Sequence, residues 1–131
     1  MTSQCPRCAG PRFTADVPAE LTAYTDAPAL ECCPRCLTVD PGDPAAVDPD
    51  PPFETVLRRF PTGTAGVALF LLLDKLDSLA LNRGEIESLV EWLESNGVDL
   101  FLTLDRLVAD PEPEPPYDLQ RRRDQLEALL D

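Results

Sequence analysis

Cys5-Pro6-Arg7-Cys8 is repeated letter for letter as Cys33-Pro34-Arg35-Cys36, with 24 residues between the two copies. Two cysteines separated by two residues place their thiolates on one tight turn, where both can reach the same ion. The proline after the first cysteine fixes φ and pre-shapes the turn. Two such turns supply the four sulfurs of a tetrahedral site. The sequence therefore predicts a structural zinc ion (Zn²⁺) held by Cys5, Cys8, Cys33 and Cys36.

The segment that contains both turns, residues 1–40, is too short to fold on a hydrophobic core of its own. Closing the loop of about 25 residues between the turns costs about 3 kcal/mol of chain entropy. Binding a structural zinc contributes about 10–16 kcal/mol at neutral pH. Because the free energy of zinc binding is larger than the cost of closing the loop, we expect this segment to fold only with metal bound and to unfold in a chelator.

The residues around the turns favour a small sheet. Apolar alternation over residues 12–17 predicts a strand, residues 18–24 predict one or two helical turns, and residues 37–39 predict a returning strand. This segment resembles the zinc-ribbon domains that carry paired CPxCG turns. Ala9 and Leu37 stand where those domains have glycine. A left-handed conformation at each would cost about 1–2 kcal/mol.

Cys32 is a fifth cysteine, directly before the second motif. It could replace Cys33 as a ligand, with three residues instead of two between the paired cysteines. We favour Cys33 because it reproduces the first motif letter for letter. Cys32 is then expected to be a small buried hydrophobe, which is the commonest role of a non-ligand cysteine.

A change in composition divides the rest of the chain. Residues 41–52 hold five prolines and no apolar periodicity, which predicts an extended linker between a ribbon (1–40) and an acidic helical domain (53–131). The expected fold class is α+β, mostly α: a small N-terminal zinc ribbon followed by a C-terminal α-helical bundle of four or five helices.

Helix signals follow one another in the C-terminal part. Asn82 followed by Glu85 resembles a capping box, Gly97 occupies a helix-ending position, and Asp99 and Asp118 are suitable N-caps. The expected helices cover residues 53–60, 64–81, a segment from Asn82 to Gly97, a segment after Asp99, and a segment from Asp118 to about Leu130.

Charge and composition exclude several functions. The chain has 24 acidic and 11 basic residues, a net charge of −13, and no histidine. Without histidine there is no Ser-His-Asp or Cys-His catalysis, no histidine-bound metal hydrolase and no Cys2His2 finger. Without a basic surplus the chain lacks the electrostatic footprint of a duplex-DNA binder. Residues 53–131 carry 16 of the acidic residues, so the charge is spread along the chain rather than confined to a tail.

The same composition favours a cytoplasmic protein that works at molar salt. Arginine outnumbers lysine ten to one, the N-terminus lacks the apolar core of a signal peptide, and an odd number of cysteines fits a disulfide framework poorly. The longest apolar run, residues 65–73, is nine residues long, whereas a membrane span needs about 20. We expect no membrane partner.

Taken whole, the chain resembles an uncharacterised family of short haloarchaeal proteins. Their shared pattern is an N-terminal double-CPxC zinc ribbon and an acidic helical region that ends in an arginine-rich and leucine-rich helix. The resemblance covers nearly the full length. It implies a fold and a source but no activity.

We therefore expect a non-enzymatic adaptor in which structural zinc supports binding to a protein partner, with self-association of the helical part as a further expectation. Two alternatives stay open. One is a redox or electron-transfer protein that uses the CPRC cysteines, with zinc or iron in the site. The other is a nucleic-acid-associated regulator that uses Arg7, Arg12 and Arg35, which molar salt disfavours.

Three further signals have ordinary explanations. The acidic stripe of Glu87, Glu91 and Glu94 is typical of a solvated helix face. Residues 63–66 open a helix but lack the lysine and the preceding strand of a phosphate loop. The basic run Arg121–Arg123 is expected to be solvated or to pair within the chain with Asp110, Glu112 and Glu114.

Overall fold

The two cysteine turns are connected through a three-stranded antiparallel sheet in the computed structural model, which describes residues 4–131. The strands β1 (Phe13–Asp16), β2 (Ala29–Cys32) and β3 (Val39–Pro41) follow the order β1-β2-β3. Cys32 lies opposite Phe13 on one side and Val39 on the other. The central strand β2 was not predicted, because its residues Ala29-Leu30-Glu31-Cys32 do not alternate between apolar and polar.

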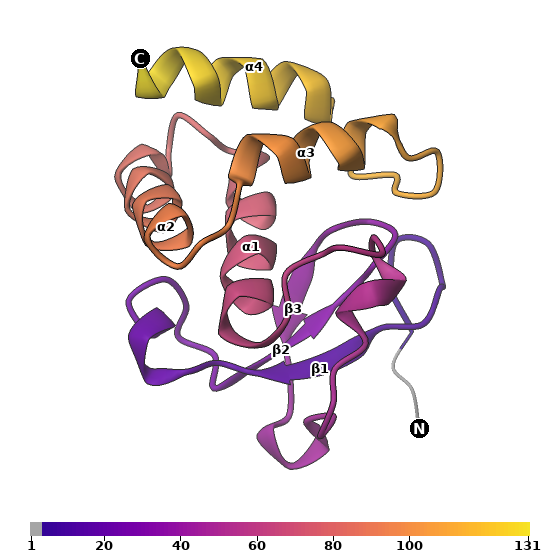
Figure 1. The fold of residues 1–131 in the computed structure, drawn as a ribbon. Coiled ribbons are helices and arrows are strands. Elements are labelled where there is room, and N and C mark those ends of the chain that lie inside the picture. Colours follow the sequence, from indigo (N-terminus) through magenta and orange to yellow (C-terminus); the bar gives the residue numbers. More distant parts are fainter. Residues whose placement is uncertain (1–3) are drawn as a thin grey trace.

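Four α helices follow the sheet within the described residues: α1 (Gly63–Leu76), α2 (Arg83–Ser95), α3 (Leu100–Ala109) and α4 (Leu119–Leu130). Residues 4–131 also contain three short 3₁₀ turns: η1 (Ala19–Leu21) between β1 and β2, and η2 (Pro44–Ala46) and η3 (Phe53–Thr55) between β3 and α1. Figure 1 shows α1 at the centre, with the sheet on one side, α2 beside it, and α3 and α4 across its end. The α+β class agrees with the prediction. Among the described residues, no helix combines the length and apolarity that a bilayer crossing requires.

The predicted ends of the last two helices are confirmed. The Asp99 carboxylate accepts a hydrogen bond from the N–H of Leu102 at 3.2 Å, and the Asp118 carboxylate accepts one from the N–H of Arg121 at 3.1 Å. Both are N-cap bonds that satisfy a backbone donor of the first turn. Gly97 has φ +84°, as a left-handed residue after a helix requires.

Asn82 is the N-cap residue of α2, as predicted, but the side-chain bonds of a capping box are absent. The Asn82 amide donates backwards to the carbonyls of Lys75 and Ser78, at 3.4 and 3.0 Å, and makes no cap bond to α2. Glu85 instead forms an ion pair with Lys75 at 2.6 Å. The helix α1 stops at Leu76, and turns over residues 77–82 replace the expected continuation to residue 81.

The segment 53–60 also differs from the expected α helix. It forms the 3₁₀ turn η3 and then irregular turns. Prolines 52 and 61 bracket the segment and leave too few residues for a regular helix. Phe53, Val56 and Phe60 are nevertheless buried, so the segment contributes to the core without forming a regular helix.

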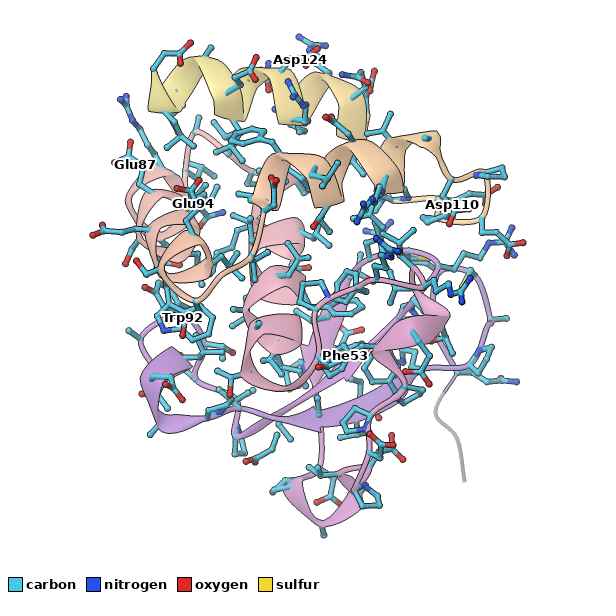
Figure 2. All side chains as sticks on the ribbon, in the orientation of Figure 1. Phe53, Glu87, Trp92, Glu94, Asp110 and Asp124 are labelled. Carbon is cyan, nitrogen blue, oxygen red and sulfur yellow. The ribbon has the colours of Figure 1, made fainter. Side chains whose placement is uncertain are left out.

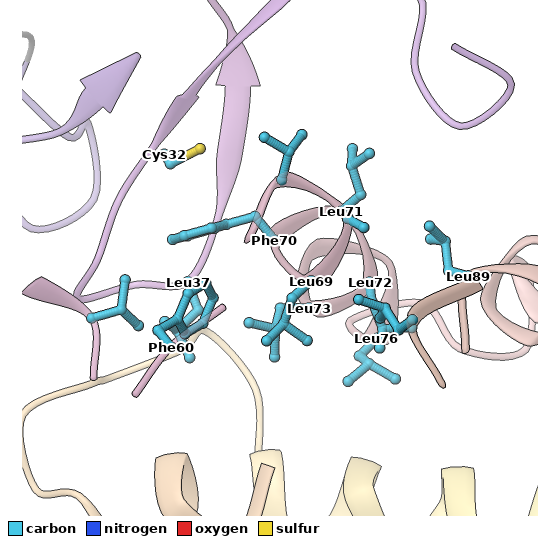
Figure 3. Packing of buried hydrophobic residues seen from close by; sticks show 14 of the residues in the cluster. Cys32, Leu37, Phe60, Leu69, Phe70, Leu71, Leu72, Leu73, Leu76 and Leu89 are labelled. Atoms are coloured by element: carbon cyan, nitrogen blue, oxygen red, sulfur yellow. The ribbon is translucent and has the colours of Figure 1, made fainter. Parts of the chain in front are cut away.

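One continuous cluster of buried side chains runs from the sheet through all four α helices. Phe13 on β1 meets Phe53 and Phe70 edge to face, with ring centroids 5.1 and 5.8 Å away. Gly66 allows this packing, because a Cβ there would lie 2.6 Å from the Pro61 carbonyl oxygen and 2.8 Å from the Phe53 ring. The sheet and the helices therefore share a core (Figure 3).

The proline-rich segment 41–52 lies along the sheet. The N–H of Asp48 donates to the Thr14 carbonyl at 3.0 Å, and the Asp48 carboxylate accepts from the N–H of Thr14 at 3.0 Å. The N–H of Gly42 donates to the Ala29 carbonyl at 2.8 Å. These bonds attach the segment to β1 and β2. Whether a ribbon and a helical domain fold as separate units stays a prediction.

Candidate metal centre

Each CPRC motif forms a turn with the same backbone bonds. We call residues 5–10 the first turn and residues 33–38 the second turn. In each, the first cysteine accepts a hydrogen bond from the N–H four residues later and donates to the carbonyl five residues later. The pairs are Ala9 to Cys5 at 2.8 Å, Cys5 to Gly10 at 2.9 Å, Leu37 to Cys33 at 2.9 Å, and Cys33 to Thr38 at 3.0 Å.

These two turns bring the four predicted cysteines together. Their sulfurs all lie within 4.8 Å of one another. The Cys5 and Cys36 sulfurs are 3.8 Å apart, and the Cys8 and Cys33 sulfurs are 3.7 Å apart. A tetrahedron with metal–sulfur bonds of about 2.3 Å has sulfur–sulfur edges of about 3.8 Å. The four side chains therefore fit a single tetrahedral ion and can hold one.

Backbone N–H groups point at the sulfurs. The N–H of Arg7 lies 3.4 Å from the Cys5 sulfur, the N–H of Gly10 lies 3.4 Å from the Cys8 sulfur, and the N–H of Cys36 lies 3.3 Å from the Cys33 sulfur. Such donors stabilise thiolates and reduce the surplus negative charge of four thiolates around a dication.

Burial of the thiols and the hydrogen bonds from these N–H groups shift the thiol pKa in opposite directions. At Cys5 burial raises the pKa, but the N–H groups of Cys8 and Arg7, together with hydrogen bonds from the Cys33 and Cys36 side chains, outweigh it and lower the pKa to about 7. Burial dominates at Cys33 and Cys36 and raises the pKa of both thiols. A metal ion that binds all four as thiolates must therefore displace protons, so metal affinity should fall as the pH falls.

Ala9 and Leu37 adopt the left-handed conformation that the missing glycines implied, with φ of +60° and +56°. Their surroundings differ. Ala9 is exposed, whereas Leu37 is fully buried and belongs to the main core. Figure 3 shows Leu37 among the buried side chains of this core. Backbone strain at Leu37 is therefore offset by burial of a large side chain, and at Ala9 it is not.

Cys32 lies apart from the sulfur cluster. Its side chain is fully buried in the main core, and its thiol lies 3.9 Å from the Leu30 carbonyl. Burial raises its pKa. Cys32 ends β2 and Cys33 begins the second turn, and neighbouring side chains on an extended chain point to opposite faces. The two adjacent cysteines therefore point into different environments.

The second turn is covered by the segment between α3 and α4. The N–H of Glu114 donates to the Arg35 carbonyl at 2.6 Å, and the Glu114 carboxylate pairs with the Arg35 guanidinium at 3.0 Å. Sequence reasoning missed this contact, because the two residues are 79 positions apart and neither carries a local signal for the other.

The first turn is more open. Pro6 and Arg7 are exposed, and Cys8 is the only one of the four clustered cysteines that is not buried. A cavity of about 160 Å³ separates this turn from the end of α1, with Asp74 and Tyr117 in its wall. The Tyr117 hydroxyl donates to the Leu73 carbonyl at 2.5 Å, which fixes the ring at this cavity.

The arginines that sequence analysis considered for phosphate binding differ in availability. Arg12 is mostly buried and pairs with Glu31 and, at 2.7 Å, with Asp40. Arg35 pairs with Glu114, and Arg7 is exposed. Two of the three positive charges are therefore already matched by carboxylates of the same chain.

Arg122 and Arg123 of the basic run at the start of α4 are bound within the chain, but not by the partners expected. Arg123 pairs with Asp105 at 2.8 Å and with Glu127 at 3.1 Å. Arg122 donates to the Asp77 carbonyl at 3.2 Å. The predicted partners lie elsewhere: Glu114 pairs with Arg35, and Asp110 accepts from the N–H of Glu112.

A family model described as "Family of unknown function (DUF6276)" matches residues 4–130. No curated protein and no solved structure matches the chain.

Proposed function

The chain belongs to DUF6276, a family of unknown function, and we propose that it is a zinc-stabilised, non-enzymatic module that binds a protein partner. The observation that carries the proposal is the closed set of four cysteine sulfurs, 3.7–3.8 Å apart in two pairs. Four protein ligands complete a tetrahedron and leave no position for a substrate or a reactive water, which is typical of structural zinc sites.

The arrangement of the core supports a structural role for the ion. Leu37 lies in the second turn and Cys32 directly precedes it, and both are fully buried in the cluster that includes all four helices. An ion that joins the two turns would therefore hold the sheet in the shape on which the helices pack. Metal binding would be coupled to folding of both parts of the chain.

A binding role is favoured over catalysis by the chemistry of the side chains. The sequence has no histidine, the commonest general base near neutral pH. The cavity beside the second turn, of about 350 Å³, is lined mainly by prolines, Arg35 and the carboxylates Glu112 and Glu114. These groups present a charged surface rather than a nucleophile with its base.

We further propose that the protein acts in a reducing, salt-rich cytoplasm. Zinc-binding thiols persist in a reducing compartment, and a net charge of −13 is best tolerated where salt screens self-repulsion. We expect the protein to melt at a higher temperature in 2 M KCl than in 0.1 M KCl, and a lower melting temperature in 2 M KCl would contradict this part.

Metal analysis tests the zinc assignment. Protein purified under reducing conditions should contain one zinc per chain and show no visible absorbance. Addition of a strong chelator should remove the zinc and abolish the circular dichroism of the folded chain. Cys32→Ala is the matched control, since it removes a thiol outside the cluster and should keep one zinc per chain. A coloured, reducible iron centre would instead support an electron carrier, and full folding without any metal would contradict the proposal.

Affinity capture tests the binding role. Zinc-loaded protein and chelated protein are used as baits in lysate at high salt, and captured proteins are identified by mass spectrometry. The proposal predicts a protein that only the zinc-loaded bait retains. Identical captures by both baits, or turnover of a disulfide substrate by the zinc-free dithiols, would contradict it.

A further inference from the structure

A groove between α2, α3 and the end of α4 lies on the helical side of the molecule, away from the sulfur cluster. Its volume is about 550 Å³. Its walls combine three carboxylates of α2 with apolar side chains of α3 and α4: Glu87, Glu91, Glu94, Phe101, Leu129 and Leu130. Figure 2 shows Glu87 and Glu94 on α2, near the last turn of α4. We call this feature the α2–α4 groove.

The floor of the groove is apolar and incompletely covered. Leu130 is 39% exposed, and Phe101 and Leu129 are half-buried at the edge of the main core. Together they present apolar surface from two helices at one place, where further apolar side chains could be buried.

The rim of the groove is negatively charged. Glu87 pairs with Arg83 at 3.2 Å, in an exposed ion pair along α2. Glu91 and Glu94 have no ion-pair partner within residues 4–131. They are one turn apart on α2, so an occupant that covers the apolar floor brings its own side chains next to both carboxylates. A cationic occupant therefore gains both contacts.

The Phe101 ring already makes a cation–π contact with a side chain of the same chain. The Arg123 guanidinium lies 5.1 Å from the centre of the Phe101 ring and is paired with Asp105 and Glu127. An aromatic ring surrounded by carboxylates suits a guanidinium or ammonium group. The groove offers the same combination to an external chain.

A second copy of this chain is a poor occupant. Each copy carries a net charge of −13, and within its basic run Arg122 and Arg123 are bound to the chain itself. The charge of the groove requires a basic partner, and its apolar floor requires one with an apolar edge. A helix with both properties places residues at i, i+3, i+4 and i+7 on one side and cations on its flanks.

We propose that the α2–α4 groove binds a cationic amphipathic helix of a partner protein. The apolar edge of that helix covers Phe101, Leu129 and Leu130, and its lysines or arginines pair with Glu91 and Glu94. This inference rests on the proposed binding role and names the chemistry of the partner.

A titration with a synthetic helix tests the proposal. The probe is a fluorescein-labelled 18-residue peptide of leucine and lysine, with leucine at the i, i+3, i+4, i+7 positions, added to zinc-loaded full-length protein in 0.15 M KCl. The double variant Glu91→Lys/Glu94→Lys should bind it at least tenfold more weakly than the wild type. The control Glu20→Lys/Glu54→Lys changes the net charge equally at exposed sites outside the groove and should stay within about threefold of the wild type.

A second pair of variants tests the apolar floor. Leu130→Ser should weaken binding several-fold, whereas Leu81→Ser should not, since Leu81 is 87% exposed and lies outside the groove. Circular dichroism and zinc content establish that each variant is folded.

Equal weakening by the two charge variants, no effect of Leu130→Ser, or no binding by the wild type would each overturn the proposal. Those outcomes, together with one zinc per chain and zinc-dependent capture of a partner, would leave the proposed function standing. Folding without metal would overturn the proposed function and leave the groove titration interpretable.

Discussion

The two CPRC turns have identical letters and the same backbone hydrogen bonds, but the protein uses them differently. The first turn is at the surface, with Pro6 and Arg7 exposed and Cys8 partly so. The second turn follows the central strand directly, and its Cys33 is fully buried. The motif thus specifies local geometry, while position in the sheet decides how much of the core depends on each turn.

Loss of one sulfur ligand is expected to have the largest effect, and the two turns should respond unequally. Cys33→Ser should abolish zinc binding and folding, because structural zinc contributes about 10–16 kcal/mol, comparable with the entire stability of a typical domain, about 5–15 kcal/mol. Cys8→Ser should retain a weakened site, since Cys8 is partly exposed and water can reach the fourth position. Zinc content after dialysis and thermal melting would measure both.

Cys32→Ala serves as the control for this pair, because it removes a buried thiol from the main core and leaves all four ligands in place. It should keep one zinc per chain. Equal loss of zinc from Cys8→Ser and Cys33→Ser would show that exposure does not distinguish the turns.

The left-handed residues of the two turns should respond to glycine with opposite signs. Leu37→Gly relieves strain of about 1–2 kcal/mol but removes a fully buried leucine, a loss of about 2–5 kcal/mol or more. It should destabilise the protein. Ala9→Gly relieves the same strain at an exposed site and loses only about 0.5–1 kcal/mol of chain entropy. It should stabilise the protein slightly, by up to about 1 kcal/mol.

Urea denaturation at a fixed free zinc concentration measures these differences. A second substitution, Leu37→Asn, helps to separate the two contributions, since asparagine tolerates the left-handed region but loses the apolar burial. If Leu37→Gly proved more stable than the wild type, backbone strain would outweigh burial in the second turn as well.

These residues also show which features of the structure a local sequence pattern can predict. The motif spacing predicted that Cys5, Cys8, Cys33 and Cys36 converge, and the absent glycines correctly implied two left-handed residues, because both features depend on a few neighbouring residues. That zinc binds there stays a prediction. Asp99 and Asp118 were identified as caps for the same reason.

Contacts between distant residues could not be predicted in the same way. The contact of Phe13 with Phe53 and Phe70 and the ion pair of Arg35 with Glu114 depend on how elements pack. The error at Asn82 has a related origin, because its amide had two possible sets of backbone partners, and the end of α1 provided the closer one. A single sequence contains no pattern that ranks such alternatives.

Asp74, next to the first turn, is expected to make the stability of the fold depend on pH. Asp74 lies at the cavity beside Pro6 and accepts a bond from the N–H of Val39 at 3.5 Å. Burial raises its pKa, the Val39 N–H and Lys75 lower it, and Asp40 and Asp77 raise it further. A carboxyl with a raised pKa in the folded state stabilises the fold below its unfolded pKa. That stabilisation is lost as the pH rises through the folded value.

Asp74→Asn should therefore be more stable than the wild type at pH 8, and the difference should shrink as the pH falls through the folded pKa of Asp74 toward the unfolded value of about 3.9. Zinc binding has its own pH dependence, but both proteins share it, so the difference in urea midpoint between them isolates Asp74. Asparagine can still accept from the Val39 N–H, which keeps that contact. A variant that is less stable than the wild type at pH 8 would show that the ionised carboxylate stabilises the cavity.

The smallest effects are expected at the two arginines, which occupy the same position in the two motifs. Arg35→Ala removes an ion pair whose partners are 56% and 65% exposed, and exposed pairs contribute little. The melting temperature should fall by no more than a few degrees at low salt, and the difference should vanish in 1 M KCl, where the Debye length is about 3 Å. Arg7→Ala should have no measurable effect. The bond from the Glu114 N–H to the Arg35 carbonyl involves only backbone atoms, so the covering segment should stay on the second turn in either variant. A large loss on Arg35→Ala that persists in 1 M KCl would instead mean that the side chain, and not the backbone, holds that segment in place.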